Sequence, residues 1–195
     1  MDDAEAQKVD LRREFRARRR AVATSSARGL RIAESVLELP ELDRVAVSHV
    51  YLATRVEVPT YRLVLALLRR GVQVVVPVLI DETLLHTEVF ARDLPSLREG
   101  LHGIPRPLTM RPTDPRTADA FIVPLVGFDR HCNRLGNGSG HYDRILAGCR
   151  NQTRPAPAIG LAFAAQEAPL LPRCPHDVAL DVVVTESFVV RRGPT

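Results

Sequence analysis

The feature that most constrains this chain is a series of short apolar segments that alternate with helical patterns between residues 44 and 187. Two of the segments, VQVVVPV (72–78) and FIVPLVGF (121–128), are apolar at nearly every position, so both of their faces must be covered. Strands of this kind are typical of parallel sheets, because the helices that connect parallel strands pack on both faces of the sheet. The sequence therefore predicts an α/β fold with a largely parallel central sheet flanked by helices.

The alternation also predicts where the individual elements lie. Strands are expected at 45–53, 72–80, 84–90, 121–128, 158–164 and 181–187, and helices at 61–71 and 141–150. The segment 92–120, with its prolines and the turn-like HGIPRP, predicts an irregular surface connection. Because 195 residues suffice for one substantial core but would cramp a second, we expect a single domain (1–195) with its α/β core at about 44–187.

The N-terminal region predicts two helices, at about 3–39. Residues 3–23 contain no proline or glycine and place Leu11, Phe15 and Val22 at helical spacing. The cluster Thr24-Ser25-Ser26 offers N-cap oxygens for a second helix, LRIAESVLEL, which Pro40 ends.

Composition excludes several classes of protein. No apolar run approaches the length of a membrane-spanning helix, and the start MDDAEAQ is acidic and polar, unlike a signal peptide. Cys132, Cys149 and Cys174 are widely spaced and form no C-x-x-C pair, which argues against a disulfide framework and against a structural zinc site. We therefore expect reduced thiols in a cytoplasmic protein without a membrane partner. A monomer is the expected state, although no sequence feature bears on it.

The stretch FDRHCNRLGNGSGHYDR (128–144) is the most unusual part of the chain. Gly136, Gly138 and Gly140 alternate with small polar residues between an expected strand and an expected helix. Oxyanions bind at such strand-to-helix turns, because free backbone N–H groups and the positive end of the helix dipole converge there. Arg134 could add a planar cation against phosphate oxygens.

The established nucleotide motifs do not fit this stretch. A P-loop needs Lys-Ser/Thr after its last glycine, and a dinucleotide fingerprint needs glycine where His141 stands. The spacing by itself leaves both a phosphate-binding loop and a plain structural turn open.

The net charge of +4 comes almost wholly from arginine, because Lys8 is the only lysine. Six arginines in the first helix invite a nucleic-acid interpretation: Arg12, Arg13, Arg16, Arg18, Arg19 and Arg20. Acidic neighbours offset much of this charge and aromatic residues are scarce, so a solvated helix face is the commoner explanation and we expect no nucleic-acid partner. Lys8 and Arg12, four residues apart, would still point the same way and could meet one phosphate chain.

Three carboxylates are candidate ligand contacts. Glu57 follows the strand at 45–53, where α/β proteins commonly place ligand contacts, although most carboxylates in such loops are only solvated. Asp143 and Asp177 could hold magnesium through oxygen atoms, although Asp177 could equally be a capping or turn residue. His131 and His141 have no second histidine or cysteine at a zinc-ligand interval, which makes metal binding the weaker interpretation.

The run VPLVGFDRHCNRLGNGSGHYDRIL (123–146) resembles the signature of the 5-formyltetrahydrofolate cyclo-ligase family, approximately P-x-x-x-F-D-x-x-x-x-R-L-G-x-G-x-G-x-Y-D. Further landmarks follow in the family's order: K-x-x-L-R at 8–12, YLATRVEVPT at 51–60, HGIPRP at 102–107 and PHDVALDVVVTE at 175–186. The resemblance implies ATP-dependent ring closure of 5-formyltetrahydrofolate to 5,10-methenyltetrahydrofolate, giving ADP and phosphate. It also implies a fold similar to ribose-phosphate isomerase and CoA-transferase domains.

The resemblance further implies roles for individual residues. Lys8 and Arg12 would bind the ATP phosphates, and Lys8 and Arg134 would be the catalytic cations. The loop around the triphosphate would comprise Arg134, Leu135, Gly136, Asn137, Gly138, Ser139, Gly140, His141 and Tyr142, of which 137–141 also face folate. Leu52 and Glu57 would contact the pterin, with Glu57 accepting hydrogen bonds from it. Asp143 and Asp177 match the Mg²⁺ positions, so ATP and Mg²⁺ are the implied cofactors.

Two positions depart from the family's pattern. His141 stands where many members have tyrosine, and Asn137 where they often have tyrosine or arginine. Aromatic surface near folate is reduced, and histidine titrates near neutrality, so turnover is expected to be weaker or more sensitive to pH. A non-catalytic or weakly active reduced-folate or nucleotide-binding paralogue is therefore the main alternative. A sugar-phosphate isomerase or acyl-CoA transferase rests on analogy of fold alone.

Overall fold

A central seven-stranded sheet with the strand order β11-β10-β9-β6-β1-β2-β3 organises the computed structural model, which describes residues 3–23, 25–150 and 155–193. Neighbouring strands from β10 to β2 are parallel, and only the edge strands β3 and β11 run antiparallel to their neighbours. The predicted α/β fold with a largely parallel sheet is confirmed. The strands are β1 (Val47–Val50), β2 (Gln73–Ile80), β3 (Thr83–Val89), β6 (Ala120–Pro124), β9 (Ala158–Leu161), β10 (Val182–Val184) and β11 (Val189–Arg191).

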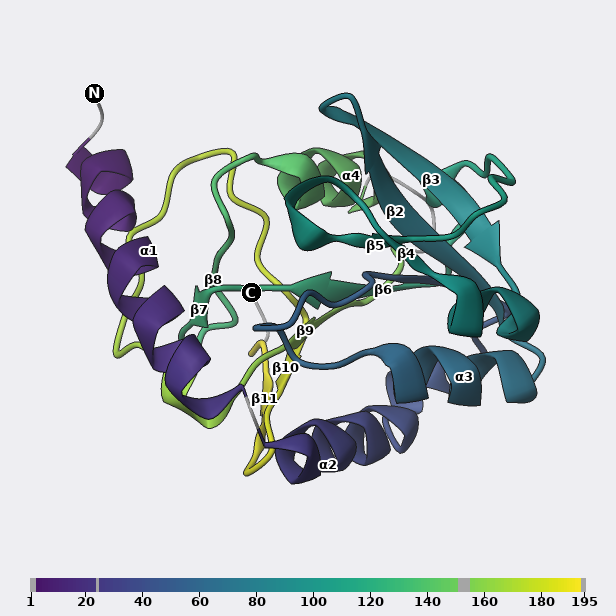
Figure 1. Ribbon diagram of the computed structural model, residues 1–195. Helices are drawn as coiled ribbons and strands as arrows, with labels where there is room; N and C mark the ends of the chain where they lie inside the picture. Colours follow the sequence, from purple (N-terminus) through teal and green to yellow (C-terminus); the bar gives the residue numbers. More distant parts are fainter. Residues whose placement is uncertain (1–2, 24, 151–154, 194–195) are drawn as a thin grey trace.

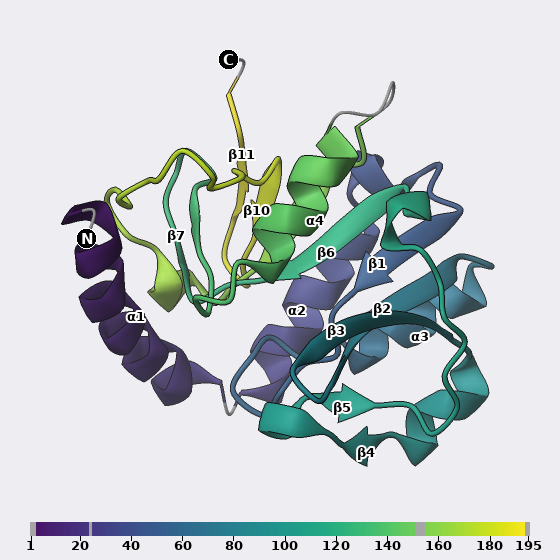
Figure 2. The same ribbon diagram turned by 90° about the horizontal axis from the view of Figure 1, so that it is seen from above.

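Helices cover both faces of this sheet. In Figure 1, α2 and α3 lie below the sheet and α4 lies above it, whereas α1 stands at one end beside β7 and β8. Figure 2 shows α1 apart from the other helices. The helices are α1 (Asp3–Val22), α2 (Ser26–Leu37), α3 (Tyr61–Arg69) and α4 (His141–Arg150), and the short strands are β4 (Arg98–Glu99), β5 (Pro105–Arg106), β7 (Gly127–Phe128) and β8 (Arg134–Leu135).

Strand β6 shows why the apolar runs predicted a buried sheet. Alternate side chains of a strand point to opposite faces. Ala120 and Ile122 pack into the core that includes α2 and α3, whereas Phe121 and Val123 pack into the core that includes α4. Because helices cover both faces, the first four residues of this strand, Ala120 to Val123, are buried.

The expected strand at 121–128 is in fact two separate strands, and the structure corrects this boundary. Strand β6 ends at Pro124, and β7 pairs instead with β8. Side chains satisfy the backbone between the two strands: Gln166 Nε2 donates to Leu125 O and Val126 O, and Arg19 Nη1 donates to Leu125 O. These hydrogen bonds from side chains take the place of the backbone hydrogen bonds that a continuous strand would make with its neighbour.

The structure also tests the predictions for the segment 92–120 and for the start of α2. The segment 92–120 is irregular as expected, with short 3₁₀ turns and the β4–β5 hairpin. Ser25 is the N-cap residue of α2, but its side chain makes no capping hydrogen bond. Thr24 lies outside the described residues. The α2 helix is therefore positioned by its buried face and not by a side-chain cap.

Gly160 lies in the strand β9 and offers a test of core packing. A Cβ there would lie 2.4 Å from Leu180 Cδ1 and 2.8 Å from Leu125 Cδ2, and both leucines are buried. Gly160→Ala should lower the free energy of unfolding by about 1–3 kcal/mol, because overfilling a packed core forces neighbours from their rotamers. Urea unfolding measures this. Gly148→Ala on α4, where a Cβ meets nothing described within 4 Å, is the control and should not destabilise; equal losses in both variants would contradict the prediction.

Candidate active site

A cavity of about 1410 Å³ opens where the parallel strands β1 and β6 end. Ligands of α/β proteins bind at the carboxyl ends of parallel strands, because loops and helix N-termini converge there. Pockets for one small molecule usually measure about 300–1,000 Å³, so this cavity has room for two ligands. Its wall includes α1, the segment after β1, the loop between β8 and α4, and the segment around 174–177. The β2–β3 hairpin and the segment 94–105 complete the lining.

The structure brings every predicted site residue to this one cavity. These residues come from four distant parts of the sequence, which only the folded chain places together. They are Lys8, Arg12, Leu52, Glu57, Arg134, Leu135, Gly136, Asn137, Gly138, Ser139, Gly140, His141, Tyr142, Asp143 and Asp177.

The glycine loop joins β8 to α4, so the expected strand-to-helix turn is present, although the strand before it is β8. Gly138 and Gly140 have φ values of +106° and +65°, which side chains rarely adopt. Arg12 Nε donates to Gly136 O at 3.1 Å, and Arg16 Nη2 donates to Asn137 O at 3.1 Å. Helix α1 thus holds the loop by its carbonyl groups at the N-terminus of α4, where a helix favours anions.

Lys8 is buried, although lysine side chains are usually solvated. Its Nζ lies 2.6 Å from Asp177 Oδ2 and 3.2 Å from Cys174 Sγ. Burial opposes the charge of Lys8, but hydrogen bonds from Lys8 to Asp177 and Cys174 outweigh it and raise the lysine pKa. Burial likewise opposes the ionised form of Asp177, but hydrogen bonds from Cys174 N and Lys8 outweigh it and lower the Asp177 pKa.

Arg134 and Asp143 form a second buried cation–carboxylate pair beside the loop. Arg134 Nη2 donates to Asp143 Oδ1 at 2.7 Å, and its Nη1 donates to Val178 O. Burial lowers the pKa of Arg134, and the charges of Asp143 and Asp177 oppose that shift. Arginine remains charged even so, because its ordinary pKa exceeds 12.

The two carboxylates suit Mg²⁺ as oxygen ligands, but protein cations already pair with both. A further group of metal-ligand types, Glu5, Cys174 and His176, lies within 4.8 Å. The Lys8 ammonium lies 3.2 Å from the Cys174 thiol and 3.6 Å from Glu5 Oε2, so it supplies the positive charge in that group.

Glu57 lies across the cavity and is held by the turn that follows β1. Tyr51 donates its hydroxyl to Val58 O at 2.9 Å, and this bond ties the two ends of the turn together. Glu57 Oε2 accepts hydrogen bonds from both the N–H and the hydroxyl of Thr54, each at 2.9 Å. Its Oε1 lies 3.8 Å from Arg19 Nη1.

Arg19 is a residue that sequence reasoning misplaced. It was expected on a solvated helix face, but it is only 6% exposed. Its spacing from Lys8, Arg12 and Phe15, in steps of four, three and four, puts all four on one side of α1. That spacing was visible in the sequence, and buried Phe15 marks the inward side.

Two residues at the start of α4, His141 and Tyr142, line the cavity together with the glycine loop and Glu57. The Tyr142 hydroxyl is buried and has no hydrogen-bond partner among the described residues. A buried donor of this kind is usually satisfied, so this hydroxyl suits contact with a ligand. His141 Nδ1 lies 3.1 Å from Ser139 Oγ, and burial followed by the Arg144 charge lowers its pKa. The titration expected near neutrality therefore shifts to lower pH, and neutral imidazole faces the cavity at pH 7.

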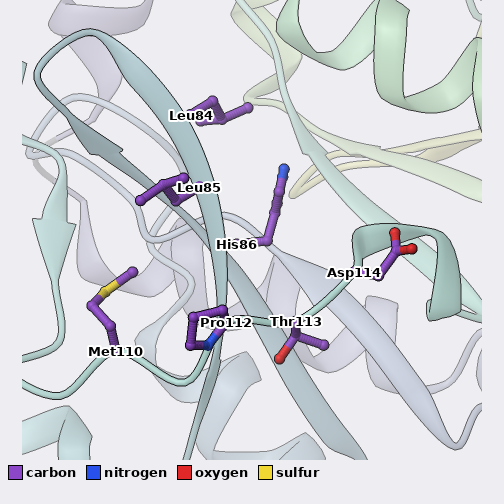
Figure 3. A pocket seen from close by; sticks show the side chains of 7 residues that line it. All are labelled: Leu84, Leu85, His86, Met110, Pro112, Thr113 and Asp114. Atoms are coloured by element: carbon purple, nitrogen blue, oxygen red, sulfur yellow. The ribbon is translucent and has the colours of Figure 1, made fainter.

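A smaller hollow of about 440 Å³ adjoins the cavity at Leu84. Figure 3 shows the His86 side chain between Leu85 and Asp114 in this hollow. None of the predicted site residues lines it. Its lining residues are Leu84, Leu85, His86, Met110, Pro112, Thr113 and Asp114.

The fold and the cavity define an α/β protein whose glycine loop and buried cations suit a polyanionic ligand, with room for a second ligand beside a buried carboxylate. The chain belongs to the 5-formyltetrahydrofolate cyclo-ligase family, whose model matches residues 4–186. None of the helices in the described ranges is long and apolar enough to cross a membrane.

Similar proteins include curated relatives and solved structures. The chain is 35% identical to a 5-formyltetrahydrofolate cyclo-ligase of Haemophilus influenzae over 66% of its own length and 70% of that protein. It is 41% identical to the Mycoplasma pneumoniae cyclo-ligase, but the aligned part spans 37% of this chain and 42% of that protein. The NMR structure of 5,10-methenyltetrahydrofolate synthetase from Aquifex aeolicus superposes with a TM-score of 0.78 at 27% identity, covering 96% of this chain and 95% of that one.

Proposed function

We propose that this protein catalyses the ATP-dependent cyclisation of 5-formyltetrahydrofolate to 5,10-methenyltetrahydrofolate, with release of ADP and phosphate. Family membership supports the reaction. The observation that carries the proposal is one cavity, large enough for two ligands, that places a cation-lined glycine loop opposite the buried carboxylate of Glu57.

The phosphate end of ATP would lie against the loop between β8 and α4. Lys8, Arg12 and Arg134 supply positive charge there, and the N–H groups at the start of α4 supply further donors. Lys8 and Arg134 would exchange Asp177 and Asp143 for phosphate oxygens. Asp143 and Asp177 would then hold Mg²⁺, which when bound neutralises phosphate charge.

The pterin end of the folate would lie against Leu52 and Glu57. The Leu52 side chain lines the cavity as an apolar surface. The Glu57 carboxylate would accept hydrogen bonds from a ring N–H and the amino group, which are donors at adjacent positions. The 137–141 segment, including neutral His141, would lie between the two ligands.

The proposed chemistry needs alignment more than a protein nucleophile. The formyl oxygen attacks the γ-phosphorus, the bond from that phosphorus to the bridging oxygen breaks, and ADP leaves. N10 then bonds to the activated formyl carbon and loses its proton, and phosphate departs with the former formyl oxygen. Positioning of the two ligands and fixed positive charge provide the catalysis.

An absorbance assay tests this function. Pure protein with ATP, Mg²⁺ and 5-formyltetrahydrofolate should form the methenyl product, followed by its ultraviolet absorbance, and omission of ATP should abolish the signal. Calorimetric binding of folate or ATP without ADP release would instead identify a non-catalytic binding protein. No product across neutral pH, with a known family enzyme active in parallel, would overturn the catalytic proposal.

Gly136 gives a test of the phosphate site that is separate from folding. A Cβ on Gly136 would meet no described atom within 4 Å, and its φ is not positive, so Gly136→Ala should keep the thermal midpoint of unfolding. Among the described residues beyond its two chain neighbours, none would contact the added methyl group, so a bound ligand is its expected contact. We expect KM for ATP to rise about tenfold while KM for folate changes little, because a close backbone approach to phosphate is lost. An unchanged KM for ATP would place the phosphates elsewhere.

A further inference from the structure

Helix α1 reaches the Glu57 side of the cavity through Arg19. Arg19 Nη1 donates to Leu125 O at 3.3 Å and lies 3.8 Å from Glu57 Oε1. Both side chains are almost fully buried, at 7% and 10% exposure. The Arg19 Nε atom is buried and has no hydrogen-bond partner among the described residues. Burying a guanidinium that lacks one of its hydrogen bonds costs free energy. This cost indicates that the positive charge of Arg19 has a functional role in the cavity.

Glu57 is the charged group that interacts most strongly with Arg19. Burial lowers the pKa of Arg19, and Glu57 is the largest charge that opposes this shift, followed by Tyr51. Arg16 and Arg20 act in the same direction as burial. Glu57 is therefore the carboxylate to which the Arg19 charge is coupled, and water screens the pair little because both groups are buried.

The geometry of Glu57 leaves one of its oxygens open to a ligand. Its Oε2 is fixed by the two hydrogen bonds from Thr54. Its Oε1 faces Arg19 at 3.8 Å, which is close enough for attraction but longer than a hydrogen bond. Oε1 can thus accept a hydrogen bond from a ligand while it stays beside the positive charge.

We infer that Arg19 is a positioning residue for the pterin end of the folate, because its charge, 3.8 Å from Glu57 Oε1, directs the Glu57 carboxylate so that the carboxylate can accept hydrogen bonds from the ring. This inference rests on the proposed function. It also gives α1 two tasks, since Lys8 and Arg12 serve the phosphate end of the same cavity, and Arg19 lies seven residues beyond Arg12 on the same side of the helix.

The test compares Arg19→Gln, which removes the charge but keeps an N–H donor, with Arg19→Lys, which keeps the charge. Arg20→Gln, an exposed position next in the chain, is the matched control. Calorimetry at neutral pH gives Kd for 5-formyltetrahydrofolate and for a non-hydrolysable ATP analogue. Arg19→Gln should weaken folate binding about 10- to 100-fold and ATP binding less than twofold. Arg19→Lys should restore most of the folate affinity, and Arg20→Gln should match the wild type.

Ligand selectivity and rescue by lysine separate positioning from simple packing. A purely structural role of Arg19 would weaken the binding of both ligands, and Arg19→Lys would not restore the folate affinity. Loss of folate affinity alone in Arg19→Gln, with most of it restored in Arg19→Lys, would therefore identify a role of the charge.

Folding of the variants is checked independently. Gln166 Nε2 also donates to Leu125 O, at 3.1 Å, so this carbonyl keeps a partner when Arg19 is replaced. If Arg19→Gln is unfolded, the comparison of Arg19→Lys with wild type still tests the inference: the folate affinity of Arg19→Lys should be close to that of the wild type. Wild-type folate affinity in Arg19→Gln, or equal loss of affinity for both ligands, would overturn the inference alone. A wild-type protein that neither binds folate nor forms product would overturn the proposed function.

Discussion

Lys8→Met should reduce kcat/KM for ATP about 10²- to 10³-fold while folate binding changes little. Loss of one preorganised cation or donor at developing negative charge typically costs this much. Lys8 is buried at the cavity wall, so its charge is screened little by water, and methionine fills similar space without the charge. Steady-state kinetics with each ligand varied in turn measures the effect.

The matched control for Lys8 is Arg13→Met on the same helix. The Arg13 side chain is 85% exposed and pairs only with exposed Asp10 among the described residues, so its loss should leave kinetics unchanged. Circular dichroism should show that Lys8→Met is folded, since Asp177 keeps its hydrogen bond from Cys174 N. Equal kinetics for the two variants and the wild type would show that ATP does not meet Lys8.

The second large effect concerns stability in acid. His49 is fully buried in β1, and its Nε2 lies 3.1 Å from His86 Nδ1. Burial, followed by the charge of His86, lowers the pKa of His49 from 6.5 to about 3. The unfolded chain therefore binds this proton near pH 6.5, whereas the folded chain excludes it. The part of the folding stability that depends on a neutral His49 is fully present above pH 6.5 and is lost as the pH falls toward 3.

Each pH unit in that window corresponds to about 1.4 kcal/mol for one group, so the free energy of unfolding should fall by about 2 kcal/mol from pH 6.5 to pH 5. Burial also lowers the pKa of His86, which acts in the same direction. Urea unfolding at several pH values measures the slope. His49→Phe should flatten it, and His131→Phe, at an exposed position, should keep it. A wild-type stability that is level from pH 7.5 to 5 would contradict the prediction.

The glycine loop shows which features of the site a local sequence pattern can predict and which it cannot. Its position before a helix and its three glycines indicated a turn, and the positive φ values of Gly138 and Gly140 require such residues. The spacing could not show that Arg12 and Arg16, more than a hundred residues earlier, hold the loop by its carbonyls. Contacts between distant segments depend on how the sheet orders its strands, which no local window contains.

Arg19 and Lys8 show that the local sequence does not predict whether a charged side chain is buried. Side-chain type predicted solvated cations on α1, because charged residues are usually exposed. The structure buries both, since α1 packs against β7 and the turn at Ala164–Gln166, and the side chains of Asp177 and Glu57 meet it there. Whether a charge is buried depends on what packs against it, and that is a property of tertiary structure.

The sequence by itself determined the α/β class and the parallel interior of the sheet, because apolar periodicity acts over a few residues. The set of residues around the cavity came from the resemblance of several short motifs to those of a known family. The end of β6 at Pro124, the pairing of β7 with β8, and the cation–carboxylate pairs that line the cavity were decided only by the tertiary structure. These features arise from hydrogen bonds and charges between segments far apart in the chain, and their energies exist only once the fold brings the partners together.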